Sequence, residues 1–205
     1  MQLVARDGSG RRALTSTDDW DLDADWSPDG TRLSFSRSPP GPDWRNGWVW
    51  TMRPDGSDAR PLVKGIAARW APDGRRLVFS AVTPRSDGDL FVVDEDGNGL
   101  RRLLATPRLE QPADWSPDGK RILFTRFVGD RASDVFVMDA DGGHVRRLTR
   151  APGLDIAGSF SPDGTRIVFT SNRLGRQHLF VMHADGTHQH ALTRGGSDDF
   201  EPTWG

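Results

Sequence analysis

The chain has 205 residues, of which 35% are apolar and 9% aromatic, and it contains 23 Gly, 14 Pro, 8 Trp and no Cys. Its net charge of -2 argues against nucleic-acid or anionic-membrane binding driven by overall charge. No apolar run is long enough to insert into a membrane as a helix. The lack of Cys excludes disulfides and thiolate chemistry. Frequent Gly and Pro between regularly spaced aromatic residues favour many short strands joined by tight turns.

An internal repeat dominates the sequence. A ten-residue segment that runs from Trp or Phe through Pro-Asp-Gly to Phe occurs at residues 26–35, 70–79, 115–124 and 160–169. A second element, Asp-Gly, is followed by a Leu at a constant distance of seven residues from the Asp. These closing residues are Leu14, Leu62, Leu103, Leu148 and Leu192. A repeat of about 40–50 residues with four strands in each copy is typical of β-propeller blades.

Each repeat predicts four short strands. The first ends at the aromatic residue, and Pro-Asp-Gly then turns the chain into the second, because Pro presets φ and Gly accepts a positive φ. A nearly continuous apolar third strand follows, as at residues 90–93 and 135–138. Asp-Gly turns the chain into the fourth strand. Strands that are apolar on both faces need cover on both sides, which neighbouring blades supply.

We therefore predict one all-β domain over residues 1–205, a β-propeller of four-stranded antiparallel blades. The complete repeats lie at about 16–62, 63–103, 104–148 and 149–192. The terminal pieces 1–15 and 193–205 are expected to form a composite, incomplete fifth blade that lacks a second strand. Exposed strand edges pair readily with other chains. We therefore expect a homo-oligomer assembled through the incomplete blade.

The Trp-Ser-Pro-Asp-Gly turn, the apolar strand that ends in Asp-Gly and the closing Leu-Thr resemble the WD-type repeats of TolB-like propellers. The propellers that cover the active site of prolyl-oligopeptidase-like enzymes have similar repeats. The resemblance extends over essentially the whole chain and implies a propeller fold. It also implies an extracytoplasmic compartment, although residues 1–7 show no hydrophobic leader. A fold of this kind hosts many functions, so the function has to be inferred from the site.

Connections that vary between repeats are the first candidates for a binding site. The Pro-Asp-Gly and Asp-Gly turns keep a constant length, whereas the connections at the other ends of the strands differ. Variable loops on a rigid scaffold commonly carry binding sites. The longest of them, residues 38–48, contains Trp44, Arg45 and Trp48, and Trp and Arg are frequent interface anchors. The alternative is that both Trp side chains pack beneath their own loop.

Acidic residues recur five positions before the aromatic that ends each first strand. They are Asp21, Glu110, Asp155 and Asp199, with Gly65 in the remaining copy. If these acids converge on one axis, their mutual repulsion should raise the pKa of at least one of them, and they would favour a cation or a basic peptide terminus. The alternative is that each acid caps its own loop through backbone N–H groups. Recurrence in four of five copies favours this local role.

Evidence for metal or catalytic chemistry is sparse. The loop that starts at Asp94 matches the first half of a calcium loop, but Ala105 stands where a bidentate Glu is expected, and a β-turn is favoured. His178, His183, His188 and His190 lie close together in the last repeat. A zinc site would need a further ligand there, and His190 fills the position of an exposed outer-strand residue. No G-x-S-x-G motif is present.

The sequence predicts a non-catalytic scaffold that binds a protein or peptide on the variable-loop face. No cofactor, metal, nucleic-acid partner or membrane insertion is expected. The first alternative is the substrate-gating propeller of a prolyl-oligopeptidase-like hydrolase whose catalytic domain lies outside this chain. The second is a propeller fragment that assembles by oligomerisation.

Overall fold

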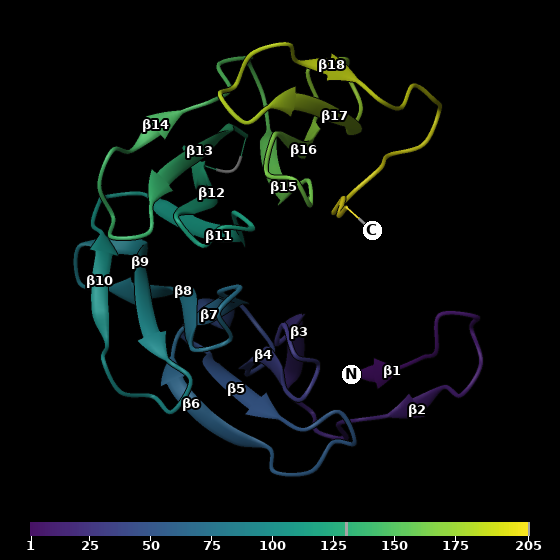
Figure 1. Cartoon of the computed structure of the whole chain (residues 1–205), viewed down its shortest axis with the longest axis vertical. Coiled ribbons are helices and arrows are strands. Elements are labelled where there is room, and N and C mark those ends of the chain that lie inside the picture. Colours follow the sequence, from purple (N-terminus) through teal and green to yellow (C-terminus); the bar gives the residue numbers. More distant parts are fainter. Residues whose placement is uncertain (130, 205) are drawn as a thin grey trace. The chain divides into compact units, whose positions relative to one another are not determined.

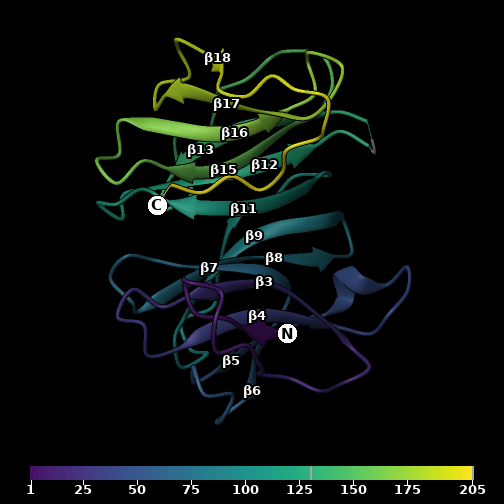
Figure 2. The ribbon, with the colours of Figure 1, turned by 90° about the vertical axis from the view of Figure 1, so that its right-hand side faces the viewer.

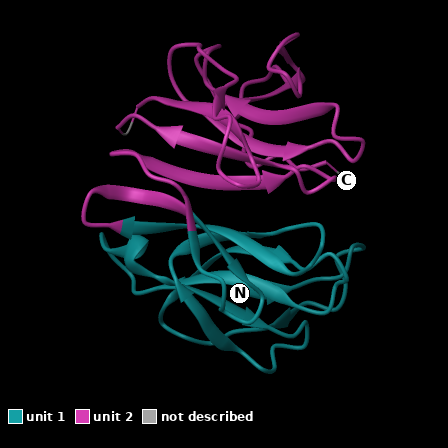
Figure 3. Cartoon of the chain, turned by 60° about the vertical axis from the view of Figure 1, so that its left-hand side comes forward, with its two compact units in different colours: residues 1–82, 91–101 teal, residues 83–90, 102–205 magenta. Residues whose placement is uncertain are grey.

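The computed structural model describes residues 1–129 and 131–204, and almost all of its regular structure is β-strand (Figure 1). The chain divides into two compact units. The first contains residues 1–82 and 91–101, and the second contains residues 83–90 and 102–205 (Figure 3). No helix within the described residues is long and apolar enough to cross a bilayer.

The first unit contains a two-stranded hairpin and one complete four-stranded blade. The hairpin consists of β1 (Gln2–Leu3) and β2 (Arg12–Ala13). The blade consists of β3 (Trp20–Trp26), β4 (Leu33–Ser38), β5 (Trp48–Met52) and β6 (Arg60–Lys64), each paired antiparallel with the next. A short 3-10 helix, η1 (Trp44–Asn46), lies in the loop between β4 and β5.

The strands of the second repeat belong partly to each unit. They are β7 (Ile66–Trp70), β8 (Arg76–Thr83), β9 (Ser86–Asp94) and β10 (Arg101–Leu104). The second unit contains two further complete blades. The third blade consists of β11 (Leu109–Trp115), β12 (Arg121–Phe127), β13 (Ser133–Asp139) and β14 (Arg146–Arg147).

The fourth blade consists of β15 (Asp155–Phe160), β16 (Arg166–Ser171), β17 (His178–His183) and β18 (His190–Ala191). Figure 2 shows these four strands side by side, in the order of the sequence. The predicted class, an all-β propeller of four-stranded antiparallel blades, is confirmed. That residues 1–205 act as a single domain stays a prediction.

Each first strand contains a bulge and ends in an aromatic residue, and two of these aromatic side chains pack on the preceding blade. The pairing of β15 with β16 shifts register between Ala157 and Ser159, and the same shift occurs in the other first strands. Phe160 then packs with Val135 and Val137 of the third blade. Trp70 packs with Val49 of the first blade in the same way. Apolar burial between consecutive blades therefore holds each unit together.

The side chains just before Trp26, Trp115 and Phe160 also form hydrogen bonds to the segment that follows in the next repeat. Asp25 Oδ2 accepts the backbone N–H of Trp70 at 2.8 Å, and Asp114 Oδ2 accepts that of Phe160 at 2.8 Å. Ser159 Oγ accepts the N–H of Trp204 at 3.0 Å. In the strands that end at Trp70 and Phe160, the bulge displaces the N–H group from the strand ladder, and an acceptor on the preceding blade satisfies it.

The two terminal segments predicted to form a composite fifth blade are described separately. β1 and β2 form the predicted third and fourth strands, but residues 199–204 contain no strand in the described structure. Two observations account for this difference. The Asp199 N–H donates to the Gln177 carbonyl oxygen, and Glu201 has a φ of 48°. The hairpin and this segment belong to different units, so the composite blade stays a prediction.

Candidate partner-binding face

The loop of residues 38–48 is folded back on its own blade. The N–H of Asn46 donates to the Asp43 carbonyl oxygen at 2.9 Å, which closes the turn of η1. Gly47 lies directly against Ser38, where a Cβ at position 47 would overlap the Ser38 hydroxyl. Its carbonyl oxygen accepts the N–H of Gly65 at 3.0 Å. The loop is therefore anchored at both ends and presents its side chains from a fixed backbone.

The two Trp side chains of this loop differ in exposure. Trp44 is half-buried, and the Arg45 guanidinium lies 5.4 Å from the centre of its ring. Trp48, at the start of β5, keeps 46% of its surface exposed. Packing beneath the loop, the alternative raised by the sequence, therefore describes Trp44 but not Trp48.

Trp48 also differs from the residues at the same position in the other blades. Asp89, Asp134 and His178 directly precede the apolar residues of the corresponding third strands, and all three are buried. Trp48 pairs across the sheet with Arg37 on one side and Lys64 on the other, and Lys64 is exposed. An exposed aromatic ring between two cations is thus specific to the first blade. Sequence inspection missed the neighbouring Lys64, because only the strand register brings it there.

Three of the four predicted acids form ion pairs within their own blades. Arg37 Nε lies 2.7 Å from Asp21 Oδ1, Arg126 Nε lies 2.8 Å from Glu110 Oε1, and Arg173 Nη2 lies 3.0 Å from Asp155 Oδ2. All three carboxylates are almost completely buried. These acids therefore act within their own blades, but through Arg side chains and not through the capping of backbone N–H groups that the sequence suggested. The role of these acids in ligand binding stays a prediction.

Each of these arginines also covers a pair of aromatic rings. The Arg126 guanidinium lies 4.4 Å from the ring centre of Phe136 and 5.9 Å from that of Phe124. The equivalent arginines cover Phe35 with Trp50 and Phe169 with Phe180. A guanidinium over an aromatic face adds a cation–π attraction to the ion pair.

The second blade lacks both members of this pair. Gly65 stands at the position of the acid and Ala81 at the position of Arg37 and Arg126. Its aromatic rings, Phe79 and Phe91, still stack at 5.7 Å. In the four complete blades the acid and the arginine are therefore present together or absent together, which identifies them as one structural unit.

Asp199 has a more open environment than the other acids. Its Oδ2 accepts the Thr193 hydroxyl at 2.6 Å and lies 3.6 Å from His178 Nδ1, and 33% of its side chain is exposed. Thr193 belongs to the closing Leu-Thr element, and its hydroxyl oxygen also accepts the N–H of Leu179. The Leu-Thr element thus links the third strand of a blade to the acid that follows it.

Burial, rather than repulsion within a ring of acids, dominates the electrostatics of Glu110. Loss of solvent raises the pKa of its carboxyl group, although Thr106 and Arg126 oppose this rise, and Asp89 adds a small further rise. Its Oε2 is buried with no hydrogen-bond partner in the described residues. Burial also opposes the charge of Asp21, but hydrogen bonds from Arg37 and Thr15 outweigh it and hold the pKa of Asp21 below its usual value.

Metal-binding geometry is not formed among the described residues, which contain no cluster of three His, Asp or Glu side chains that could hold an ion. In the loop considered for calcium, Asp96 Oδ1 accepts the N–H of Asn98 at 2.9 Å, as in a tight turn. In the His-rich repeat, the rings of His183 and His188 stack with centres 4.3 Å apart.

Comparison with known proteins places this geometry in a known fold. A model of the TolB beta propeller domain matches residues 127–205. TolB from Acinetobacter baumannii superimposes with a TM-score of 0.79 at 19% identity, over 97% of this chain and 49% of that chain. The chain has a TolB-like β-propeller fold. It spans about half the length of the Acinetobacter protein.

Two further solved structures resemble this chain. The putative TolB from Agrobacterium tumefaciens has a TM-score of 0.78 at 22% identity, over 95% of this chain and 69% of that chain. An oligogalacturonate lyase in complex with manganese has a TM-score of 0.65 at 14% identity, over 94% of this chain and 59% of that chain. No curated protein matches the sequence. At these identities the likeness establishes the fold alone.

Proposed function

We propose that this chain is a non-catalytic scaffold that binds a protein or peptide on its variable-loop face, with Trp48 as the anchor. The observation that carries the proposal is the exposure of Trp48 at a position where the other blades bury a polar residue. Trp is among the residues whose truncation costs most at protein interfaces. An exposed ring on an anchored loop binds with little loss of conformational entropy.

The chemistry around Trp48 indicates the kind of partner. Lys64 lies beside it across the strand pair, and Arg45 lies in the same loop over Trp44. Arg and Lys next to an exposed ring favour a segment that combines an apolar or aromatic side chain with acidic residues. The carboxylate of Asp21 is already paired with Arg37. It therefore leaves the positive charges of Lys64 and Arg45 available to an acidic partner.

The buried acids support a scaffold role rather than a catalytic one. Asp21, Glu110 and Asp155 each share a hydrogen bond with an arginine of the same blade. A general acid or base has to reach the substrate with a free proton-transfer site. Their pairing with arginines over aromatic rings gives these carboxylates a role in holding the blade.

Photo-crosslinking from position 48 tests the proposal. A benzophenone amino acid replaces Trp48 in one variant and Trp26 in the control, since Trp26 is similarly exposed at 44% but lies at the Pro-Asp-Gly end of β3. Exposed to extracts of the source cells, the position-48 variant is expected to form an adduct of defined mass with another protein. Equal labelling from both positions, or none from position 48, would contradict the proposal.

A further inference from the structure

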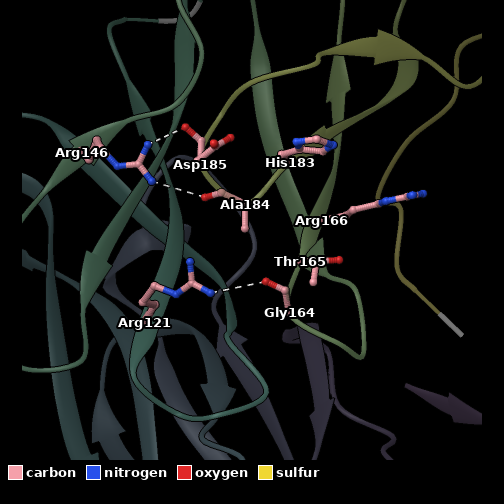
Figure 4. A pocket seen from close by; sticks show the side chains of 8 residues that line it. All are labelled: Arg121, Arg146, Gly164, Thr165, Arg166, His183, Ala184 and Asp185. Atoms are coloured by element: carbon pink, nitrogen blue, oxygen red, sulfur yellow. Dashed lines mark hydrogen bonds between the residues drawn. The ribbon is translucent and has the colours of Figure 1, made fainter.

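A hollow of about 510 Å³ lies between the third and fourth blades, at the turn ends of their strands (Figure 4). Both blades belong to the second unit. The residues that line the hollow come from the second and fourth strands of the third blade and from the two turns of the fourth blade. The lining residues are Arg121, Arg146, Gly164, Thr165, Arg166, His183, Ala184 and Asp185. This volume is in the range of small-molecule sites.

Cationic side chains outnumber acidic ones in this lining. Three arginines and one histidine face a single acid, Asp185. Its carboxylate is engaged within its own turn, where Oδ1 accepts the N–H of Thr187 at 2.9 Å and the Thr187 hydroxyl at 2.6 Å. The backbone carbonyl of Asp185, not its carboxylate, contacts Arg146.

The arginines of this hollow are not neutralised by ion pairs. In the corresponding second-strand position of the first two blades, Arg32 pairs with Asp58 at 3.0 Å and Arg76 with Asp73 at 2.9 Å. Across the described residues, no ion pair within 4.0 Å involves Arg121, Arg146 or Arg166.

Two of these arginines are held in place by the blades themselves. Arg146 donates to the Asp185 carbonyl oxygen at 2.5 Å and to that of Ala184 at 3.4 Å. Arg121 donates to the Gly164 carbonyl oxygen at 3.4 Å, and its guanidinium lies 5.2 Å from the ring centre of Phe160. Figure 4 shows both arginines on one side of the turn and His183 on the other. A guanidinium has five N–H donors, so each arginine keeps donors for a ligand.

Comparison of the repeats shows which side chain each blade has at the position of His183. It is Arg53 in the first blade, Asp94 in the second and Asp139 in the third. Asp139 Oδ2 lies 2.6 Å from His144 Nδ1, so the acid of the third blade already has a partner. Because His183 stands in place of this Asp, the lining of the hollow has one negative charge fewer than the equivalent positions of the second and third blades would supply.

We propose that this hollow binds a phosphate group, either as the free ion or as part of a small phosphorylated molecule. Fixed guanidinium groups bind tetrahedral oxyanions through short, charge-assisted hydrogen bonds, and two arginines can hold different oxygens of one phosphate. The site is separate from the loop of residues 38–48, so it does not depend on the proposed partner-binding face.

Calorimetric and NMR titration at constant ionic strength tests the site with inorganic phosphate and with glucose 6-phosphate. Saturable binding is expected, with changes in the side-chain signals of Arg121 and Arg146. The two probes separate the ligand sources: tighter binding of the ester indicates a phosphorylated molecule, and equal binding indicates the free ion. Either outcome supports the site.

Matched variants make the test specific. Arg146→Gln removes a charged hydrogen-bond donor, and His183→Asp adds a negative charge to the lining. Each is therefore expected to weaken phosphate binding about tenfold or more. Arg12→Gln is the control, because Arg12 donates to the Pro54 and Asp55 carbonyl oxygens as Arg146 does to Ala184 and Asp185. Failure to saturate, unchanged affinity in both test variants or an equal loss in the control would overturn the proposal.

Discussion

Arg126 joins Glu110 to the aromatic core of the third blade. Its Nε lies 2.8 Å from Glu110 Oε1, and its guanidinium lies 4.4 Å from the ring centre of Phe136. One side chain thus neutralises a fully buried carboxylate and covers an aromatic face. The same arrangement in the first and fourth blades shows that these acids serve the blade in which they lie.

Removal of Arg126 alone should destabilise the chain. In Arg126→Met, Glu110 remains buried without its partner, and breaking a buried pair in this way costs about 3–5 kcal/mol. The double variant Glu110→Leu/Arg126→Met should recover much of this loss, because the second blade forms with Gly65 and Ala81 instead of the pair. Urea unfolding measures both effects. A double variant that is as unstable as the sum of the two single variants would refute the coupling.

Much of the fold could be predicted from the sequence because the turns are determined locally. Ser161 Oγ accepts the N–H of Arg166 and donates to Asp163, so the residues of the Ser-Pro-Asp-Gly element make its turn themselves. The Asp-Gly turns close in a similar way. Local hydrogen bonds of this kind depend only on residues within a short stretch of chain, which the repeat displays directly.

The partners of the acids could not be identified with the same certainty. Asp21 and Arg37 are 16 residues apart, as are Glu110 and Arg126, but Asp155 and Arg173 are 18 apart. The different spacing hides the common pair, which becomes visible only once the strand register is known. The exposure of Trp48 and the burial of Trp44 depend on how their loop folds, and no repeated copy of that loop exists for comparison.

The pH dependence of stability should reveal Glu110. Because burial raises the pKa of its carboxyl group above 4.5, the folded chain holds a proton that the unfolded chain releases. This proton adds to the free energy of unfolding at pH values below the pKa of Glu110 in the unfolded chain. The contribution is lost as the pH rises through the pKa of Glu110 in the folded chain. Glu110→Gln should therefore flatten the fall in unfolding free energy over this range. If the unfolding free energies of the variant and the parent change with pH in parallel, the raised pKa of Glu110 is contradicted.

The hydrogen bond between Asp25 and Trp70 should contribute to the joining of the first two blades. Asp25→Ala leaves the Trp70 N–H without its acceptor, which should lower the unfolding free energy by about 1–3 kcal/mol. Asp25→Ser should lose less, because Ser159 makes the same contact to Trp204. Denaturant unfolding of the two variants provides the comparison. Equal losses would show that the acceptor is unimportant.

Gly142 should be more sensitive to substitution than Gly8, although both lie in Asp-Gly turns with positive φ, 93° and 82°. A Cβ at position 142 would overlap the Leu103 carbonyl oxygen, whereas one at position 8 meets nothing within 4 Å. Gly8→Ala should cost about 1–2 kcal/mol from backbone strain alone. Gly142→Ala should cost more, as measured by thermal unfolding. A similar melting temperature for both variants would argue against this close approach between blades.

The affinity of Trp48→Ala for the crosslinked partner tests the proposed function most directly, with Trp26→Ala measured alongside. Loss of an interface anchor costs about 2 kcal/mol or more, which is a weakening of about thirtyfold. The expected result is this loss in Trp48→Ala, with wild-type affinity in Trp26→Ala and unchanged unfolding in the position-48 variant. Wild-type affinity in Trp48→Ala would contradict the proposal that this ring anchors a partner.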